Sequence, residues 1–282
     1  MEDKLFTLAS PNFSHLAIVA ASVTAITLTG CGKAFTSGTE HLGDSGVTVD
    51  TDSGSNTTST ISKDGLLLWL RSDRGVSMDN GFVSSWADQS GLYFDARQDQ
   101  MESRPTLVVA GIGGHAALRF DGVDDFFQLP SGMADFSAGL SVFVVVNEQQ
   151  PDSYNSFVEF SNGGEVDDIS FGEYQDQIAY EVLDQATQGN AVTYDTPQIL
   201  AVIHRSDSTL VMRRNGATAG AAVVTLPDVI TREQNFVGQS LYSGSETYPG
   251  VMGEVLVYGR ALSDSETLNV ENDLQRRWNC CN

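Results

Sequence analysis

Short apolar runs, separated by glycine, aspartate, asparagine and proline, make up most of the chain after residue 65. Several of these runs alternate apolar and polar residues, for example around Ile178, Tyr180 and Val182. A period of two places one set of side chains on a single face of a strand. The pattern predicts strands over residues 66–71, 116–121, 140–147, 156–161, 168–174, 177–183, 199–205 and 250–258.

Two short segments add detail to this strand pattern. Val142 to Val146 is apolar at every position, which is typical of a strand buried on both faces, so we expect it in the middle of the fold. Asn215-Gly216 follows the run LVMRR and predicts a tight hairpin, because both residue types accept the positive φ of a type I′ turn.

One helix is predicted, near the C-terminal end. Ser263 and Glu266 have the spacing of a capping box, in which each side chain bonds the backbone amide of the other residue. Apolar residues follow near helical spacing as far as Trp278. Arg276 and Arg277 lie at the end of this segment, where the helix dipole favours cations.

The beginning of the chain has a different pattern. The apolar run over residues 16–28 is too short to span a membrane and has the length of a signal-peptide core. It ends in Leu28-Thr29-Gly30-Cys31, which resembles the lipobox of bacterial lipoproteins. The resemblance implies cleavage before Cys31 and lipidation of that cysteine. Because Gly32 follows in place of aspartate, the outer membrane or cell surface is favoured.

Residues 32–62 are rich in Ser, Thr, Gly and Asp, a composition that buries too little apolar area to order itself. We expect a flexible tether here. The predicted organisation is therefore a signal peptide over residues 1–30, a lipidated cysteine and tether over residues 31–62, and one domain over residues 63–282. Such a protein is held at the bacterial cell envelope by its lipid anchor alone.

Charge excludes one class of partner. The chain has 37 acidic and 15 basic residues, a formal charge of −22, and its only lysines, Lys4, Lys33 and Lys63, precede most of the domain. A nucleic-acid backbone would be repelled by such a surface, so we expect no nucleic-acid partner.

The cysteines are Cys31, Cys280 and Cys281. Adjacent cysteines rarely pair, because disulfide geometry requires a wider separation of the Cα atoms. We therefore expect a fold that stands without an internal disulfide. The sequence leaves open whether Cys280 and Cys281 are free thiols or form intermolecular links.

Five segments carry a family resemblance: GLLLWLRSD (65–73), SWADQSG (85–91), RPT (104–106), ALRFDGVDD (117–125) and GEVLVYGRALS (253–263). In this order and spacing they resemble the laminin-G-like branch of the concanavalin A-like lectin/glucanase superfamily, over residues 65–278. The resemblance implies an all-β fold: a two-sheet antiparallel jelly-roll sandwich with one concave sheet and a short C-terminal helix. Relatives include sugar binders, adhesion modules and glycan-cleaving enzymes, so the fold does not fix the function.

Carboxylates in turns are the candidate metal ligands. Asp121, Asp124 and Asp125 share one acidic turn, and Asp88 lies in the WADQSG turn. Calcium takes six to eight oxygen ligands and is the candidate cation at both places. The alternative, which we favour, is an ordinary turn in which the aspartate side chains bond nearby backbone amides.

The segment EVDDIS invites a test for catalysis. Laminarinase-type glucanases of the superfamily use three acidic residues on one strand, and Glu165 and Asp167 match the first two positions. Ser170 stands at the third position, so the acid/base is missing. Because glycoside hydrolysis needs two carboxyl groups in defined roles, we interpret this segment as an acidic loop and assign no catalytic residue.

Aromatic side chains are the candidate glycan contacts. Tyr174, Tyr242 and Tyr248 lie on loops or strand ends, where they can meet a sugar. Trp69 and Trp86 fall on strands that the resemblance makes core-facing, so we expect them in the core.

The expected function is an envelope-anchored, non-catalytic module that recognises a glycan or an extracellular protein. One alternative is a glycoside hydrolase or another polysaccharide-active enzyme that uses Glu165 and Asp167. A second alternative is a structural spacer of the envelope.

Overall fold

The computed structural model describes residues 61–149, 154–164, 166–183, 185–241 and 246–281. The chain divides into two units, Met1–Ser55 and Asn56–Asn282, and the described strands and helix all belong to the second. The predicted signal peptide, Cys31 and nearly all of the predicted tether lie outside the described residues, so the lipid anchor stays a prediction. Within the described part, no helix has the length and apolarity that a membrane span requires.

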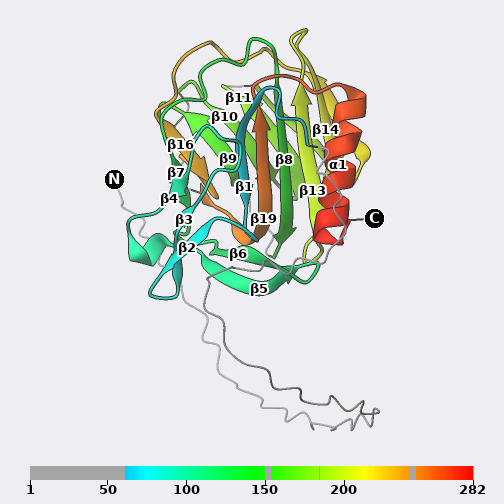
Figure 1. The fold of residues 1–282 in the computed structure, drawn as a ribbon. Coiled ribbons are helices and arrows are strands. Elements are labelled where there is room, and N and C mark those ends of the chain that lie inside the picture. Colours follow the sequence, from blue (N-terminus) through cyan, green and yellow to red (C-terminus); the bar gives the residue numbers. More distant parts are fainter. Residues whose placement is uncertain (1–60, 150–153, 165, 184, 242–245, 282) are drawn as a thin grey trace, which may run out of the picture. The chain divides into compact units, whose positions relative to one another are not determined.

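The fold is all-β with one C-terminal α-helix, as the hydrophobic pattern predicted (Figure 1). All the strands expected from that pattern are present. In chain order the elements are β1 (Leu66–Arg71), β2 (Val76–Asp79), β3 (Phe82–Trp86), β4 (Ala96–Arg97), the short 3₁₀ helix η1 (Met101–Ser103), β5 (Thr106–Ile112), β6 (His115–Asp121), β7 (Phe127–Leu129), β8 (Leu140–Glu148), β9 (Tyr154–Ser161), β10 (Ile169–Tyr174), β11 (Gln177–Val182), β12 (Gln185–Ala191), β13 (Gln198–His204), β14 (Thr209–Arg214), β15 (Ala217–Val223), β16 (Gln234–Val237), β17 (Gln239–Ser240), β18 (Glu246–Thr247), β19 (Pro249–Tyr258) and α1 (Asp264–Trp278).

The strands form one 17-stranded antiparallel network and one separate pair, β17 with β18. One half of the network runs β1–β19–β8–β13–β14–β15, and the other runs β7–β16–β9–β10–β11–β12. Strands β3 to β6 connect the halves, because β6 pairs with β19 and β4 pairs with β7. Hydrogen bonding therefore continues from one half to the other in a curled, barrel-like sheet, whereas the sequence predicted two separate sheets.

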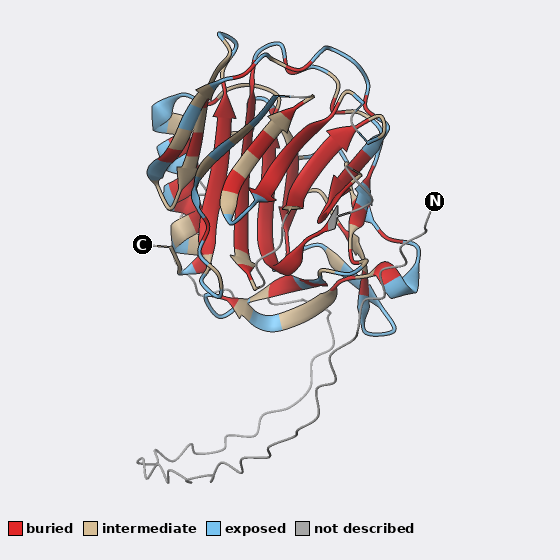
Figure 2. Cartoon of the chain, turned by 180° about the vertical axis from the view of Figure 1, so that it is seen from behind, coloured by how far each residue is buried: buried red, intermediate tan, exposed pale blue. Residues whose placement is uncertain are grey.

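The larger core lies between the two halves of the network. It contains Val142, Val144 and Val146 of β8 together with Phe157 of β9 and Phe171 of β10. Most strand residues of both halves are buried, as the view from behind shows (Figure 2).

The predicted tryptophan positions are confirmed. Trp86 is fully buried and packs on Phe127 with a ring-centroid distance of 6.1 Å, and Trp69 is 8% exposed. Burial of such large rings contributes strongly to the core.

A second core covers the other face of β8. Phe143 and Val145 pack in one cluster with Val270, Leu274 and Trp278 of α1. Alternate residues of β8 thus serve different cores, and this explains why residues 142–146 are apolar at every position. The expectation of a doubly buried central strand is confirmed.

The helix begins and ends as the sequence indicated. The Ser263 side chain accepts a hydrogen bond from the backbone amide of Glu266, and the Glu266 side chain accepts from the amide of Ser263, which completes the capping box. Asn279 ends the helix in the left-handed conformation, with φ of 44°. The hairpin at Asn215 and Gly216 is also present, with φ of 50° and 82°.

Glu254 of β19 ties the helix to the sheet. Its fully buried carboxylate accepts hydrogen bonds from the indole Nε1 atoms of Trp69 (2.5 Å) and Trp278 (2.7 Å), and from Arg277 (2.5 Å). Such a buried charge is tolerated because cationic and polar partners surround it.

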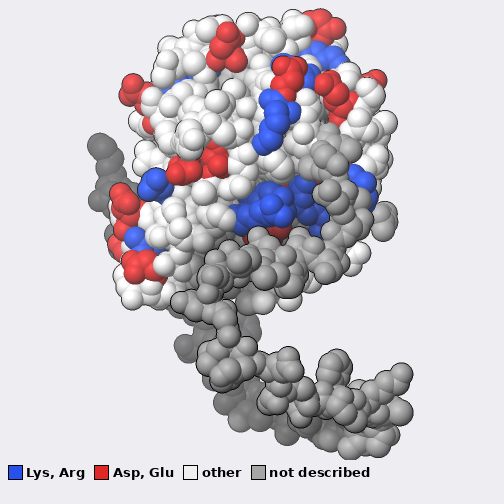
Figure 3. All heavy atoms as spheres, viewed as in Figure 1, with Lys and Arg blue, Asp and Glu red and all other residues white. Residues whose placement is uncertain are grey.

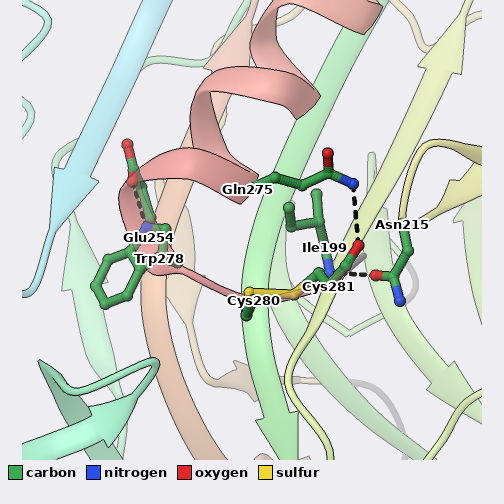
Figure 4. Close-up of a disulfide and its surroundings, with 7 residues drawn as sticks. All are labelled: Ile199, Asn215, Glu254, Gln275, Trp278, Cys280 and Cys281. Atoms are coloured by element: carbon green, nitrogen blue, oxygen red, sulfur yellow. Dashed lines mark hydrogen bonds between the residues drawn. A yellow bond between two sulfur atoms is a disulfide. The ribbon is translucent and has the colours of Figure 1, made fainter.

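Cys280 and Cys281 are joined by a disulfide (Figure 4). The expectation that these neighbours stay unpaired is wrong, and the backbone supplies the reason. Asn279 and Cys281 both take positive φ, and Gln275 binds this turn by donating a hydrogen bond from Nε2 to the Cys281 carbonyl at 2.9 Å. The bond connects adjacent residues, so the described cores are held together without a long-range cross-link.

Candidate functional site

A cleft of about 230 Å³ lies over strands β9 to β12. Phe171 of β10 and Ile178 of β11 point into the larger core, so their neighbours Gly172 and Ala179 face the other way, towards the cleft. The residues that line the cleft are Tyr154, Ser170, Gly172, Tyr174, Ala179, Tyr180, Glu181, Ala186, Thr187 and Gln188.

Small residues form the floor of the cleft, and one of them is required by the backbone. A Cβ on Gly172 would lie 2.0 Å from the carbonyl oxygen of Asn155 on the neighbouring strand. The pairing of β9 with β10 shifts register next to Gly172, which brings the two backbones together. Ala179 and Ala186 keep the adjoining surface low.

Two tyrosines form an aromatic wall. Tyr154 and Tyr174 are cross-strand partners whose rings meet at 62° with a centroid distance of 6.1 Å. The Tyr154 hydroxyl donates a hydrogen bond to Ser170 Oγ at 2.9 Å, and burial raises the pKa of Tyr154, so this phenol stays protonated. Tyr174 is 39% exposed. The cleft therefore offers one fixed ring and one accessible ring.

Polar groups lie opposite this wall. Thr187 and Gln188 of β12 and Glu181 of β11 provide hydroxyl, amide and carboxylate groups. Gln188 donates a hydrogen bond from Nε2 to the Tyr174 carbonyl at 2.8 Å, which fixes its orientation. Among the described residues that line the cleft, none is Lys or Arg, and only Glu181 is acidic.

Basic side chains gather elsewhere, on the face shown in Figure 3. Lys63, Arg71 and Arg277 surround the ring of Trp69, with cation-to-centroid distances of 4.3, 5.7 and 5.6 Å. These cations pack on the ring of Trp69, which itself packs against β19 and α1.

The three tyrosines predicted to contact a glycan differ in their environments. Tyr174 lines the cleft. Tyr248 is fully buried, and its ring packs against Phe120 and Phe157, so the expectation that it meets a ligand is wrong. Tyr242 lies outside the described residues. Tyr154 was not predicted from the sequence. The available signal was its spacing: Tyr154 lies two residues before Ser156, the first residue of the predicted strand.

The acidic turn brings three predicted metal ligands together. Carboxylate oxygens of Asp121, Asp124 and Asp125 lie within 4.8 Å of one another. Asp121 also accepts hydrogen bonds from the amides of Val123 (2.8 Å) and Asp124 (3.3 Å), as in an ordinary aspartate turn. Burial, followed by repulsion from Asp121, raises the pKa of Asp125 to about 7.

Asp88 does not join this group. Its Oδ1 accepts hydrogen bonds from the amides of Trp69 (2.9 Å) and Ser90 (2.8 Å), and its Oδ2 accepts from Ser90 Oγ (2.5 Å) and the amide of Phe94 (3.1 Å). Four donors occupy this carboxylate, which supports the turn interpretation for Asp88.

In the segment tested for catalysis, Ile169 and Ser170 lie on a strand, β10, and the described residues before them do not. Glu165 is outside the described residues, and Asp167 precedes β10 in a bend with φ of 54°. Asp167 Oδ2 accepts a hydrogen bond from Asn162 at 3.0 Å, and Arg232 donates to the Asp167 carbonyl at 2.6 Å. Asp167 thus lies in a loop, and the interpretation of the rest of the acidic stretch stays a prediction.

Comparison with known proteins gives similarity at the level of the fold. No protein-family model matches the chain, and no curated protein is similar to it in sequence. The solved structures similar to it include domain 4 of AbnA, a GH43 extracellular arabinanase from Geobacillus stearothermophilus, in complex with arabinotriose. That pair has a TM-score of 0.55 and 17% identity, over 73% of this chain and 98% of the domain.

Two further structures have similar scores. Trypanosoma rangeli sialidase in complex with sialic acid has a TM-score of 0.53 and 15% identity, over 77% of this chain and 34% of the sialidase. The binding domain of Paraclostridial Mosquitocidal Protein 1 has a TM-score of 0.56 and 10% identity, over 75% of this chain and 53% of that chain. At these identities the comparisons support the β-rich fold alone.

Proposed function

We propose that the protein is a non-catalytic glycan-binding module of the bacterial cell envelope, held there by a lipid on Cys31. The observation that carries the proposal is the cleft over β9 to β12, where exposed Tyr174 stands beside a floor of Gly172 and alanines. An aromatic ring offers an apolar face to the C–H groups of a sugar, and polar groups opposite it can bond the hydroxyls.

The chemistry of the lining favours binding over hydrolysis. Glycoside hydrolases with two catalytic carboxyl groups place them about 5–10 Å apart across the bond that breaks. In the described lining of this cleft, Glu181 provides the single carboxylate. The loop that contains Asp167 lies outside the lining as well. A glycoside hydrolase therefore remains the less favoured alternative.

The charge of the lining favours a neutral glycan. No described lining residue carries a positive charge, and Glu181 is acidic, so a uronic or sialic acid would meet repulsion without a compensating cation. A neutral sugar chain meets only hydrogen-bonding groups and the tyrosine wall.

The similar structures also support a carbohydrate-related role. One was solved with arabinotriose, another with sialic acid, and a third is named a binding domain.

We further propose that the curled sheet is a flattened jelly roll of the laminin-G-like type, since its two halves enclose a single core. An extracellular protein partner and a purely structural spacer are the alternatives to a glycan partner.

Calcium at the acidic turn is a separate proposal. Asp121, Asp124 and Asp125 bring three hard oxygen donors together, and the pKa of Asp125 is raised by burial first and then by repulsion from Asp121. These donors fit Ca²⁺, which takes carboxylate and backbone oxygens.

The first prediction tests the cleft. Replacing Tyr174 by alanine removes the accessible ring, and we expect affinity for a neutral polysaccharide such as arabinan or a β-glucan to fall about tenfold or more, from loss of ~1.5 kcal/mol of ring contact. Affinity electrophoresis and titration calorimetry over neutral and anionic glycans measure this change.

Tyr93→Ala is the matched control, because Tyr93 is 82% exposed and lies outside the lining. Its affinity should equal that of the unaltered protein. Equal affinity of Tyr174→Ala and the unaltered protein would rule out this cleft. Failure of the folded protein to bind any glycan would leave the protein-partner and spacer alternatives.

A further inference from the structure

Two glutamates meet inside the larger core. Glu148 ends β8 and Glu173 lies near the end of β10, and both side chains are fully buried. By alternation, Glu148 lies on the same face of β8 as Val146, and Glu173 lies on the same face of β10 as Phe171, so both point into the space between the halves of the network. Their carboxyl groups lie within hydrogen-bonding reach of each other.

The hydrogen bonds of this pair are incomplete. Glu173 accepts from Asn155 Nδ2 at 2.9 Å and from the Tyr194 hydroxyl. Neither carboxylate oxygen of Glu148 has a hydrogen-bond donor, and the side-chain oxygen of Asn155, also fully buried, has none either. Three buried oxygens, two of Glu148 and one of Asn155, therefore lack a hydrogen-bond partner, although buried polar atoms are nearly always paired.

Among the described residues, no cation forms an ion pair with either glutamate. Burial and the proximity of Glu173 raise the pKa of Glu148 far above its ordinary range. Two buried carboxylates within hydrogen-bonding reach of each other require either a proton between them or a positive ion.

We propose that Glu148, Glu173 and the side-chain oxygen of Asn155 form an interior binding site for a divalent cation, with calcium as the ion that suits them. All the donors are hard oxygens, which Ca²⁺ prefers, and the two carboxylates neutralise its charge. The oxygens of Glu148 and Asn155 accept no hydrogen bond from the protein, so they are available as ligands of the cation. The site is distinct from the acidic turn of Asp121, Asp124 and Asp125.

Tyr194 lies between the buried pair and the protein surface. Half-buried Tyr194 shares the single proton of its hydroxyl between Glu173 and the exposed carboxylate of Asp176, whose Oδ1 lies 2.7 Å away. Gln198 holds the segment with Tyr194 in place through two hydrogen bonds with the backbone of Thr193, at 2.8 and 3.1 Å. An ion that enters the proposed site would pass Tyr194.

The position of the site indicates what the ion does. Glu148 belongs to one half of the strand network and Glu173 to the other, so a shared cation links the halves at one end of the core. Tyr174, the exposed ring of the cleft, follows Glu173 on β10 and points to the opposite side of the strand. The inference does not depend on glycan binding.

The test uses the full chain, treated with a chelator, and Ca²⁺ alone as the probe. Asp121→Asn weakens the acidic turn, and in this background we expect one Ca²⁺ per chain by titration calorimetry. We expect the melting temperature to rise by about 5–10 °C at a concentration about 100 times the dissociation constant. The double variant Asp121→Asn/Glu148→Gln should bind no Ca²⁺ and should show no rise.

Two results would overturn the proposal. One is a folded Asp121→Asn protein that binds no Ca²⁺, together with a Glu148→Gln variant that is at least as stable as the unaltered protein. The two glutamates then share a proton and not a cation. The other is Ca²⁺ binding that persists in the double variant. If the double variant does not fold, Tb³⁺ luminescence of the Asp121→Asn protein decides: we expect tyrosine-sensitised emission that Ca²⁺ competes away, and its absence rejects the site.

Discussion

At the scale of single residues, similar sequence positions led to opposite environments. Tyr174 and Tyr248 both lie next to a strand end, yet Tyr174 lines a cleft and Tyr248 is sealed by the rings of Phe120 and Phe157. The difference comes from strands far apart in the chain. Period-two alternation shows that a face is buried but does not show which tyrosine at its edge another strand covers.

Asp125 leads to a prediction on pH. Its pKa is about 7 in the folded protein and ~3.9 in an unfolded chain. Between these values the folded state holds a proton that the unfolded state has released, so the contribution of Asp125 to stability is present below pH ~4 and is lost as the pH rises through 7. We expect Asp125→Asn to reduce the fall in melting temperature between pH 5 and pH 8, measured in chelator. An unchanged slope would show that Asp125 ionises freely.

Glu254 provides a prediction on stability. Replacing it by alanine leaves the indole N–H groups of Trp69 and Trp278 and the guanidinium of Arg277 without their shared acceptor. We expect a loss of about 3–5 kcal/mol in the free energy of unfolding, as for other broken buried ion pairs. Urea denaturation measures it, with exposed Glu102→Ala as the control that should change stability little.

At the scale of elements, local signals gave reliable strands and a reliable helix. The capping box of Ser263 and Glu266 is local, because both partners lie within one turn, and it formed as predicted. The disulfide of Cys280 and Cys281 was missed because it depends on positive φ just after the helix, which side-chain types there do not reveal.

The helix cap gives a prediction for this scale. Ser263→Ala removes the acceptor for the Glu266 amide, and we expect the free energy of unfolding to fall by about 1 kcal/mol. Because α1 covers the second core, loosening of its first turn should also raise amide exchange there. Hydrogen exchange followed by mass spectrometry measures the second effect, and unchanged exchange over residues 263–267 would contradict it.

At the scale of the whole molecule, two cores and one strand network lie within residues 61–281. Ile61 belongs to the second core, and the Tyr258 hydroxyl donates to the Ser62 carbonyl at 3.2 Å, so the packing of the domain includes residues 61 and 62.

A chain that begins at residue 61 should therefore fold by itself. We expect a circular dichroism spectrum dominated by β-structure and one cooperative thermal transition, because the apolar contacts of both cores lie inside this piece. A spectrum dominated by helix, or a chain that stays unfolded, would show that residues before 61 are needed for the fold.

The sequence by itself determined the all-β class, the strands with a clear apolar pattern, the doubly buried strand through Val144, and the capped C-terminal helix, but not strands β5, β12 and β15, whose residues are mostly exposed or half-buried. These features follow from side-chain period and local hydrogen bonds, which neighbouring residues decide. Only the tertiary structure decided that the halves of the network join through β3 to β6, that Tyr154 and Tyr174 form one wall, and that Glu148 meets Glu173. Each of these depends on strand pairing between distant segments, where register fixes which side chains meet.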